Sequence, residues 1–423
     1  MADIGQERLR ILMVMHMPWN RDLGGPRVQI ELGEEFVKFG HHVEKFSFED
    51  AFPKEGGWAR LAARYFPPDF AARAVAFVRR QAGRFDVIDA NQGNLPCTKR
   101  QLGFEGLLVA RSVGLHEFYE RFAKFADEKW PAKRSAKAAL LGALGRRAAA
   151  RAARHATRSL ETADLINVPN RDELRFLADR LGLDGKCCVF PYGLAGARWQ
   201  EFRYACRMGS DERRFRHTVA FVGAWCPRKG SKDWGAIIRR VRQRAPNARF
   251  LFLGTGFGAR AVLRDLNQEA CDWIRVVPRF TSAELPELLA EATVGAFPSY
   301  IEGFPFGVLE MLAAGLPTVS YDVPGPRAML NVSHLNLLVK AGDANGLGDR
   351  VGSLLELPAE EYGALAEECV SIAGAFNWSK IAADTLAVYR RALRRLPGSH
   401  ATGLSGRVAS DASSVPTPGD RPA

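Results

Sequence analysis

Short apolar runs and longer amphipathic runs alternate along the chain. The first apolar run, RILMVM, covers residues 10–15, and a helical pattern, VQIELGEEFVKFG, follows a loop with two adjacent glycines. A second strand-like run, HHVEKFSF, covers residues 41–48. Short apolar stretches predict strands, whereas apolar positions spaced three and four apart predict a helix. This segment is therefore predicted to be a strand–helix–strand unit.

The same alternation continues to about residue 395 and divides into two series. Strands that alternate with helices favour parallel sheets with helices on both faces. We therefore expect the α/β class, with two doubly wound, Rossmann-like domains facing an inter-domain cleft, because ligands collect at the carboxyl ends of such strands. The further strands are expected at residues 85–90, 107–112, 163–170, 186–193, 218–223, 249–256, 274–280, 294–299, 317–322 and 335–340.

Changes in composition along the chain predict its domain boundaries. Residues 1–200 and 217–378 each carry one series of strands and helices, and the polar, arginine-rich residues 201–216 between them are expected to form a hinge. Residues 379–395 show a last helical pattern, which we expect to cross back to the first domain. Residues 396–423 are rich in serine, proline, glycine and alanine, a composition typical of a disordered tail.

Charge and cysteine content narrow the range of partners and compartments. The formal net charge of +12 indicates an anionic partner, and a nucleotide, a phosphate, a membrane and a nucleic acid all satisfy it. The seven cysteines are scattered and form no paired motif, so we expect neither a disulfide framework nor a zinc site, and a reducing compartment fits. No apolar run approaches the roughly 20 residues of a membrane-spanning helix.

Two glutamates, Glu302 and Glu310, bracket seven uncharged residues after an expected strand that ends at Ser299. We expect a helix to begin near Phe306 or Gly307, with Glu310 in its first turn. The free N–H groups at a helix start form a site for phosphate, and Glu310 can accept hydrogen bonds from ribose hydroxyls, with Glu302 nearer a sugar. Two carboxylates that only cap a helix fit the same residues, so both interpretations stay open.

A basic pair, Arg228 and Lys229, follows the expected strand at residues 218–223. On a loop that faces a cleft, these cations can neutralise a diphosphate as the leaving group gains charge. A solvated surface loop is the alternative, and it is the usual place for such a pair. Gly254 and Gly256 follow the next strand in GTGFG, which is similar to a phosphate-binding turn but is not specific by itself.

Taken together, these motifs resemble the GT-B glycosyltransferases, and within them the family-4 retaining sugar-nucleotide transferases. The resemblance covers most of residues 10–395, and its most specific part is PSYIEGFPFGVLEMLAAGLPTVSYDVPGP, which has the family's two glutamates separated by seven residues. FVGAWCPRKGSKDW, FLGTG and AFNWSKIAADTLAVY occur in the family's order. GGPRVQIELGEEFVKFGHHV and FDVIDANQG resemble its acceptor-binding domain.

The resemblance implies a role for each site residue. The first domain would bind the acceptor and the second the nucleotide sugar. Glu302 would contact the donor sugar and stabilise the transition state, and Glu310 would bind the donor ribose. Arg228 and Lys229 would hold the diphosphate, with no metal and no other cofactor. The remaining donor contacts would come from Gly24, Gly25, Gly223, Gly254, Gly256, Gly303, Phe304, Phe306, Gly307 and Val308.

Two positions depart from the family's pattern. Ala224 stands where many relatives have an arginine, so either Arg228 shares that phosphate contact with Lys229 or one phosphate contact is missing. Val113 stands where relatives often have a histidine that meets the donor sugar. Two other histidines are therefore catalytic candidates, namely His116, three residues further on, and His16, after the first strand, although a loop histidine is often only solvated.

Residues 131–160 contain eight lysines and arginines and no acid. Cations and leucines that share one helical stripe fit the surface of an anionic membrane, and a solvated helix is the alternative. A nucleic acid is not expected, because the chain has no recognisable reading module. At helical spacing the stripe consists of Lys133, Lys137, Leu140, Leu144, Arg147, Arg151, Arg154 and Arg158.

The leading hypothesis is a retaining glycosyltransferase of the hexosyltransferase type. It would move a sugar from a nucleotide-diphosphate sugar to a hydroxyl of a glycan, a glycolipid or a lipid-linked sugar. This would place it in cell-envelope polysaccharide biosynthesis, in the cytoplasm and at the inner face of the membrane. The alternatives are a non-catalytic nucleotide-sugar-binding protein and a GT-B phosphorylase or sugar-nucleotide epimerase.

Overall fold

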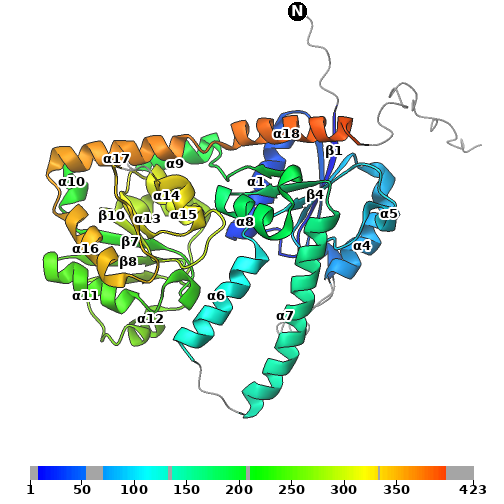
Figure 1. Cartoon of the computed structure of the whole chain (residues 1–423). Helices are drawn as coiled ribbons and strands as arrows, with labels where there is room; N and C mark the ends of the chain where they lie inside the picture. The colour runs from blue at the N-terminus through cyan, green and yellow to red at the C-terminus, as the bar shows by residue number, and fades with distance from the viewer. Residues whose placement is uncertain (1–7, 54–69, 132–135, 206–209, 332–333, 397–423) are drawn as a thin grey trace, which may run out of the picture.

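Two lobes make up the molecule, each built on a six-stranded parallel sheet (Figure 1). The computed structural model describes residues 8–53, 70–131, 136–205, 210–331 and 334–396, and the expected tail at 397–423 lies outside the described residues. Both sheets carry helices on their faces, so the expected α/β class with two Rossmann-like lobes is confirmed. Each of the twelve expected strands is present.

The first lobe contains the sheet with the order β2-β1-β3-β4-β5-β6. Its strands are β1 (Arg10–Val14), β2 (His42–Phe46), β3 (Val87–Asn91), β4 (Leu107–Arg111), β5 (Leu165–Val168) and β6 (Cys187–Val189). Its helices are α1 (Gly24–Lys38), α2 (Phe48–Ala51), α4 (Phe70–Gln81), α5 (Lys99–Leu102), α6 (His116–Lys129), α7 (Ala136–Thr162) and α8 (Arg171–Leu181), with short 3₁₀ turns η1 (Ala82–Arg84) and η2 (Asp184–Lys186).

The second lobe contains the sheet with the order β12-β11-β10-β7-β8-β9. Its strands are β7 (Thr218–Val222), β8 (Arg249–Leu253), β9 (Ile274–Val277), β10 (Val294–Phe297), β11 (Thr318–Tyr321) and β12 (Leu338–Val339). Its helices are α11 (Trp234–Arg244), α12 (Ala259–Asp265), α13 (Leu285–Ala290), α14 (Phe306–Ala313), α15 (Pro324–Leu330), α16 (Ala344–Leu355) and α17 (Ala359–Gly374), with 3₁₀ turns η3 (Pro227–Lys229) and η4 (Ser282–Glu284).

The strand order of the second sheet creates one switch point, between β7 and β10. These two strands pair in parallel, with Val294 opposite Val219 and Gly295 opposite Ala220. From β7 the chain continues to one side through β8 and β9, and from β10 to the other through β11 and β12. The loops that follow β7 and β10 therefore diverge, which leaves a crevice at the carboxyl edge where doubly wound sheets bind ligands.

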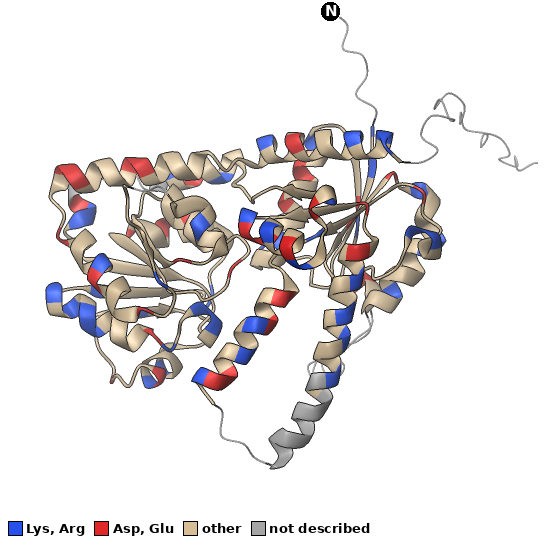
Figure 2. Ribbon diagram, viewed as in Figure 1, with Lys and Arg blue, Asp and Glu red and all other residues tan. Residues whose placement is uncertain are grey.

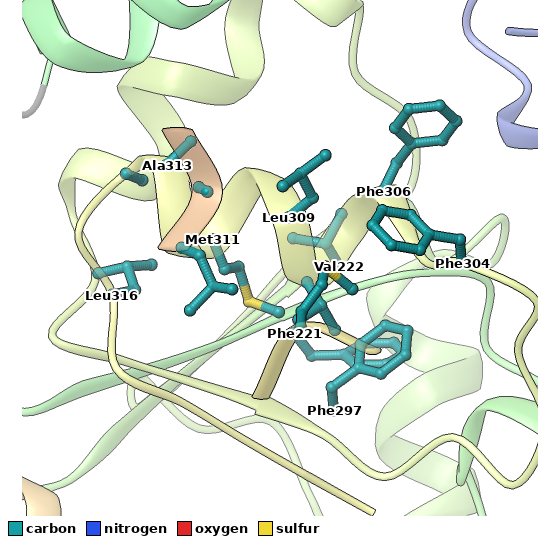
Figure 3. Packing of buried hydrophobic residues seen from close by; sticks show 14 of the residues in the cluster. Phe221, Val222, Phe297, Phe304, Phe306, Leu309, Met311, Ala313 and Leu316 are labelled. Atoms are coloured by element: carbon teal, nitrogen blue, oxygen red, sulfur yellow. The ribbon is translucent and has the colours of Figure 1, made fainter. Parts of the chain in front are cut away.

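Helix α14 lies on this switch point and is buried on nearly all sides. Its apolar residues, including Leu309 and Met311, belong to the same buried cluster as Phe221 of β7 and Phe297 of β10 (Figure 3). A helix that is apolar all round belongs in a protein interior rather than at a surface. Packing in the core of the second lobe therefore fixes the position of α14, so that its first residues face the crevice.

Glu310 corrects one detail of the sequence interpretation. It is the fifth residue of α14, and the first turn of this helix contains no acidic residue. The expectation that Glu310 lies in the first turn is therefore wrong, because the helix begins at Phe306 and its first turn ends before Glu310. A carboxylate this far inside a helix cannot cap the free N–H groups at its start, so the capping interpretation fails for Glu310.

The chain passes between the lobes in two short non-helical segments, residues 190–195 and 375–377, which pair with each other at Leu194 and Asn377. Helices α9 (Gly196–Ala205) and α10 (Ser210–Arg214) lead into the second lobe, and α18 (Trp378–Arg394) returns along the first. The last helix is joined to the first lobe by buried polar groups: the Tyr389 hydroxyl donates to Asp89 Oδ2 at 2.7 Å, and Arg111 Nη2 lies 2.6 Å from the same oxygen. Such fully paired buried groups define a unique docking position for α18.

Candidate active site

A cleft of about 520 Å³ lies between the two lobes. The first lobe contributes the start of α1 and the loops that precede it and that follow β4, and the second lobe contributes the loops that follow β7, β8 and β10. Twelve of the residues expected from the sequence line this cleft: Gly24, Gly25, Gly223, Arg228, Lys229, Gly254, Glu302, Gly303, Phe304, Phe306, Gly307 and Glu310. His16, His116, Gly256 and Val308 are not among the lining residues.

Glu302 is held by two cations from the loop after β7. Its Oε1 atom lies 2.5 Å from Lys229 Nζ and 3.2 Å from Arg228 Nη1. The Ser299 hydroxyl donates to the same oxygen at 2.5 Å, and Glu302 is only 7% exposed. The basic pair and the glutamate, 73 to 74 positions apart in sequence, therefore form one cluster at the switch point of the second sheet.

Burial shifts the acid–base properties of this cluster. It lowers the pKa of Lys229, although the nearby Glu302 carboxylate opposes that shift. Burial also opposes the charge of Arg228, but Glu302 and Tyr119 outweigh it and raise the pKa of that guanidinium. Arg228 therefore stays cationic at any pH at which the protein folds, whereas Lys229 loses its proton more easily than an exposed lysine.

The glycines next to Glu302 serve packing between protein segments. A Cβ atom on Gly307 would lie 2.9 Å from the carbonyl oxygen of Val222, and one on Gly303 would lie 2.8 Å from the Cα of Gly114 in the other lobe. Both distances are too short for a residue with a Cβ atom. These glycines let α14 approach β7 and the loop at Gly303 approach the first lobe. Both also line the cleft, and their expected contact with a donor stays a prediction.

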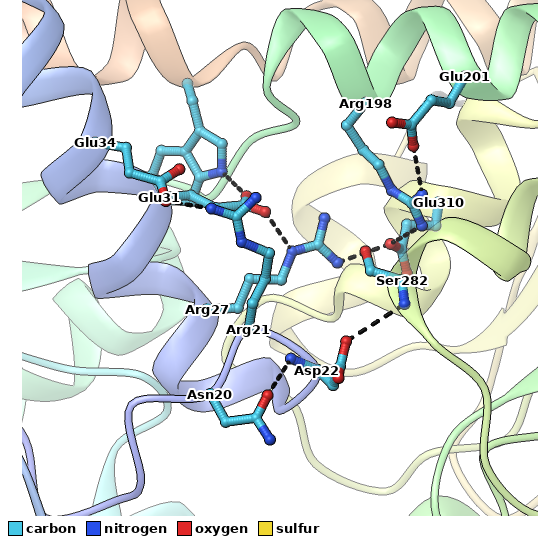
Figure 4. Close-up of polar contacts among 11 residues, drawn as sticks. Asn20, Arg21, Asp22, Arg27, Glu31, Glu34, Arg198, Glu201, Ser282 and Glu310 are labelled. Carbon is cyan, nitrogen blue, oxygen red and sulfur yellow. Dashed lines mark hydrogen bonds and ion pairs between the residues drawn. The ribbon is translucent and has the colours of Figure 1, made fainter.

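Glu310 has one cation partner from the first lobe and one from α9, which packs against α13 and α14 (Figure 4). Its Oε1 atom lies 2.7 Å from Arg27 Nη1, on α1, and 3.4 Å from Arg198 Nη2, on α9. Arg27 also pairs with Glu31, Nε to Oε1 at 2.7 Å, and its guanidinium lies 4.4 Å from the centre of the Phe306 ring. Charges this deeply buried are stable only when paired.

Neither Arg27 nor Arg198 was among the residues expected from the sequence. One signal was available, because Arg27 and Glu31 are four residues apart on a helix whose neighbouring positions are apolar. Charges on the buried face of a helix indicate an ion pair or a ligand site. Burial opposes the charge of Arg27, and Glu310 and Glu31 more than compensate, so that its pKa is raised.

The two candidate histidines occupy different positions. His16 reaches solvent and its Nδ1 lies 3.1 Å from Asn94 Oδ1, while desolvation by the surrounding protein lowers its pKa. His116 is the first residue of α6, and its Nε2 lies 3.4 Å from Glu120 Oε1 on the same helix. Tyr119, one turn further along α6, lines the cleft instead, 5.5 Å from the Arg228 guanidinium.

A second polar contact joins the lobes beside Glu302. Asn170 Nδ2 donates to the carbonyl oxygen of Gly303 at 2.7 Å, and the Asn170 side chain also caps α8. The neighbouring Glu173 is fully buried and accepts a 2.6 Å hydrogen bond from the Ser112 hydroxyl. Burial raises the pKa of Glu173 to about 7. The sequence did not single out these residues. They support the loop that contains Val113, which forms part of the cleft wall.

Helix α7 runs without interruption and projects with α6 away from the first sheet (Figure 1). Arg147, Arg151, Arg154 and Arg158 are exposed along it (Figure 2). Lys133 lies outside the described residues. None of the described helices combines the length and the apolar content that crossing a membrane requires. Within the described part of the chain, no cluster of three or more His, Cys, Asp or Glu side chains is arranged to hold a metal ion.

Comparison with known proteins begins with the second lobe. Residues 216–357 match the family model described as Glycosyl transferases group 1. A D-inositol 3-phosphate glycosyltransferase of Mycobacteroides abscessus is 28% identical over 239 residues, which cover 55% of this chain and 50% of that protein. The chain therefore spans about half the length of this curated relative.

Solved structures match nearly the whole chain. A sucrose-phosphate synthase from Thermosynechococcus elongatus has a TM-score of 0.68 at 20% identity, over 91% of this chain and 99% of that one. HepE of Anabaena, in complex with UDP and glucose, has a TM-score of 0.62 at 15% identity, over 91% and 100%. The fold is GT-B. The resemblance to GT-B glycosyltransferases is thereby confirmed at the level of fold and of the family signature in the second lobe.

Proposed function

We propose that this chain is a metal-independent, retaining glycosyltransferase that moves a hexose from a nucleotide-diphosphate sugar to a hydroxyl acceptor. The observation that carries the proposal is the cluster of Arg228, Lys229 and Glu302 at the switch point of the second sheet, beside the first residues of α14. The M. abscessus relative, a glycosyltransferase by name, and HepE with its bound UDP and glucose support a nucleotide-sugar donor.

Charge balance explains how a donor would use this cluster. Arg228 and Lys229 are now compensated by one carboxylate, that of Glu302. A diphosphate seated between the cations and the N–H groups at the start of α14 would supply the balancing negative charge itself. Glu302 would then be available for the donor sugar, and Glu310 for the ribose hydroxyls. In this arrangement the two cations would carry out the neutralisation that a divalent metal performs elsewhere.

The reaction would take place on one face of the donor sugar. The acceptor hydroxyl, presented from the first lobe, would form the new bond to the anomeric carbon while the bond to the diphosphate breaks. The hydroxyl proton would pass to the departing phosphate oxygen, so that the configuration at the anomeric carbon is kept. Arg228 and Lys229 would stabilise the charge that grows on the leaving diphosphate, and Glu302 the positive charge on the sugar ring.

A two-stage experiment tests this proposal. Thermal unfolding of the full chain is first followed with UDP-, GDP- and ADP-sugars, because a ligand that binds the folded state raises the unfolding temperature. Each donor that binds is then incubated with glycan, glycolipid and lipid-linked acceptors, with and without EDTA. We expect transfer or donor hydrolysis that EDTA leaves unchanged and a product of retained configuration. Binding without any turnover would favour a non-catalytic binding protein, and loss of activity in EDTA would contradict the metal-independent mechanism.

The exposed arginines of α7 support a further part of the proposal, a peripheral contact of residues 131–160 with an anionic membrane. A cytoplasmic enzyme held at the inner face of the membrane would meet lipid-linked acceptors of cell-envelope polysaccharides there. We expect salt-sensitive sedimentation with vesicles that contain phosphatidylglycerol, and none with neutral vesicles. Changing Arg147, Arg151 and Arg154 together to Glu should abolish it. Equal binding of the altered and unaltered proteins would contradict this contact.

A further inference from the structure

Arg27 joins the two lobes at the residue that the proposed function assigns to the donor ribose. It belongs to α1 of the first lobe and is 6% exposed, while Glu310 belongs to α14 of the second lobe and is 4% exposed. The residues are 283 positions apart, yet Nη1 of Arg27 and Oε1 of Glu310 are only 2.7 Å apart. The site assigned to the ribose therefore contains a side chain from the opposite lobe.

Several contacts hold the Arg27 guanidinium in one position. Its Nε donates to Glu31 Oε1 at 2.7 Å, and Glu31 in turn accepts a hydrogen bond from the indole of Trp378 on α18. The face of the guanidinium lies over Phe306, the first residue of α14. Contacts with α1, α18 and α14 therefore orient Arg27 together, and they fix the direction in which its guanidinium points toward Glu310.

The contacts of Glu310 are one-sided. Within the described part of the chain, both cation contacts, from Arg27 and from Arg198, end on Oε1. Arg198 is itself oriented by Glu201, with Nη1 and Oε2 2.7 Å apart. Two cations that end on the same oxygen hold that atom in place, and the second oxygen, Oε2, keeps its capacity to accept hydrogen bonds.

We propose that Arg27 is a positioning residue for nucleotide recognition: it holds Oε1 of Glu310 so that Oε2 accepts the ribose hydroxyls of the donor. This inference rests on the proposed function. Ribose recognition is then divided between the lobes. Glu310, which accepts the hydrogen bonds from the ribose, belongs to the second lobe, and Arg27, which orients Glu310, belongs to the first. Arg27 acts through Glu310 and is not itself a catalytic residue.

The experiment compares ribonucleotides with deoxyribonucleotides. Binding of UDP, GDP and ADP, and of their 2′-deoxy and 3′-deoxy forms, is measured by calorimetry on the full-length protein. A hydroxyl that donates to a buried carboxylate contributes enough that its removal weakens binding about 10- to 100-fold. We expect this ratio for the unaltered protein, a ratio near one for Arg27→Met and Glu310→Gln, and an intermediate ratio for Arg27→Lys, which keeps the charge.

Two controls separate positioning from simple loss of contact between the lobes. Arg327→Met removes another ion pair between the lobes, that of Arg327 Nη1 with Asp172 Oδ2 at 3.0 Å, without touching Glu310, and should keep the full ratio. Inorganic pyrophosphate, which has no ribose, should bind to Arg27→Met as it binds to the unaltered protein. Its binding also reports that the variant is folded, and Arg27→Lys provides a second test if Arg27→Met fails to fold.

The outcomes are distinct. An unchanged ratio in Arg27→Met overturns the inference while leaving the proposed function intact. An equal fall of the ratio in Arg327→Met overturns it as well, because contact between the lobes would then be the cause. If no nucleoside diphosphate binds the unaltered protein, the proposed function fails and the inference fails with it. In the double variant Arg27→Met with Glu310→Gln, we expect no loss beyond that of Glu310→Gln alone.

Discussion

Glu302 and Glu310 lie eight positions apart, and each is a buried carboxylate held by two cations, yet the cations come from different parts of the molecule. Arg228 and Lys229, which hold Glu302, belong to the same lobe and follow the neighbouring strand β7. Arg27 and Arg198, which hold Glu310, come from the first lobe and from the helix that leads out of it. One cluster is internal to a lobe, and the other joins two lobes.

This difference has a physical consequence for a two-lobed enzyme. The three charged groups of the cluster at Glu302 all belong to the second lobe, so their ion pairs do not need a charge from the first. The pair of Arg27 with Glu310 exists only while α1 and α14 are in contact. We therefore expect the diphosphate to be held by one lobe alone, and the ribose to be recognised only when the lobes meet. Four predictions, in order of decreasing effect, sharpen or contradict this comparison.

The largest effect is expected on stability, where a buried pair within one lobe is compared with the shared cluster between lobes. Asp89→Asn leaves Arg111 buried without the carboxylate that it pairs with and should lower the free energy of unfolding by about 3–5 kcal/mol. Glu310→Gln leaves Arg27 paired with Glu31 and Arg198 with Glu201, so the loss should be about 1–2 kcal/mol. Urea unfolding measures both, and equal losses would contradict the comparison.

The second prediction concerns turnover. Glu302→Gln removes one charge next to the reacting sugar and should lower kcat by about 100- to 1000-fold, the usual loss for one group that stabilises a transition state. Donor affinity should change far less, because Arg228 and Lys229 remain. Steady-state kinetics with varied donor separates the two quantities. A fall in affinity with kcat unchanged would place Glu302 in donor binding alone.

The third prediction concerns the diphosphate. Lys229→Ala should weaken binding of the donor and of pyrophosphate alike, by about tenfold to a hundredfold, because a charge-assisted hydrogen bond is lost. Lys232→Ala is the matched control, since Lys232 follows three residues later and pairs at the surface with Asp265. Calorimetry measures both variants. Unchanged affinity in Lys229→Ala would contradict the assignment of this lysine to the diphosphate.

The smallest effect is a shift in pH dependence. Burial lowers the pKa of Lys229, so its proton is lost as the pH rises through a value below that of an ordinary lysine. Pyrophosphate affinity, which needs the cation, should therefore be full at neutral pH and decline on the alkaline side. Lys229→Arg should remove this decline, because arginine stays charged. The same alkaline decline in Lys229→Arg would show that another group titrates.

The sequence predicted the two sheets and much of the cleft, and the reasons are local. Strands such as RILMVM and TVAFV are apolar because both faces of a parallel sheet are covered, and that pattern is visible without a structure. Arg228, Lys229 and Glu302 follow strands, and in a parallel sheet the residues that follow strands gather at one edge. Their common cluster could therefore be expected from strand positions alone.

The residues that the sequence missed, or placed differently, depend on packing between distant segments. Arg27 and Asn170 reach the second lobe only because the lobes are in contact, and nothing near them in the chain indicates their partners in that lobe. The roles of His16 and His116 stay predictions, and neither residue lines the cleft, whereas Tyr119 does.

The amino-acid sequence by itself determined the α/β class, the twelve strands and the loops that carry the charged residues, because these follow from short-range periodicity and turn chemistry. Only the tertiary structure decided which cation holds which glutamate. Ion pairs depend on distances of a few ångströms between atoms, and those distances are set by how α1, α9, α14 and α18 pack together rather than by the order of residues along the chain.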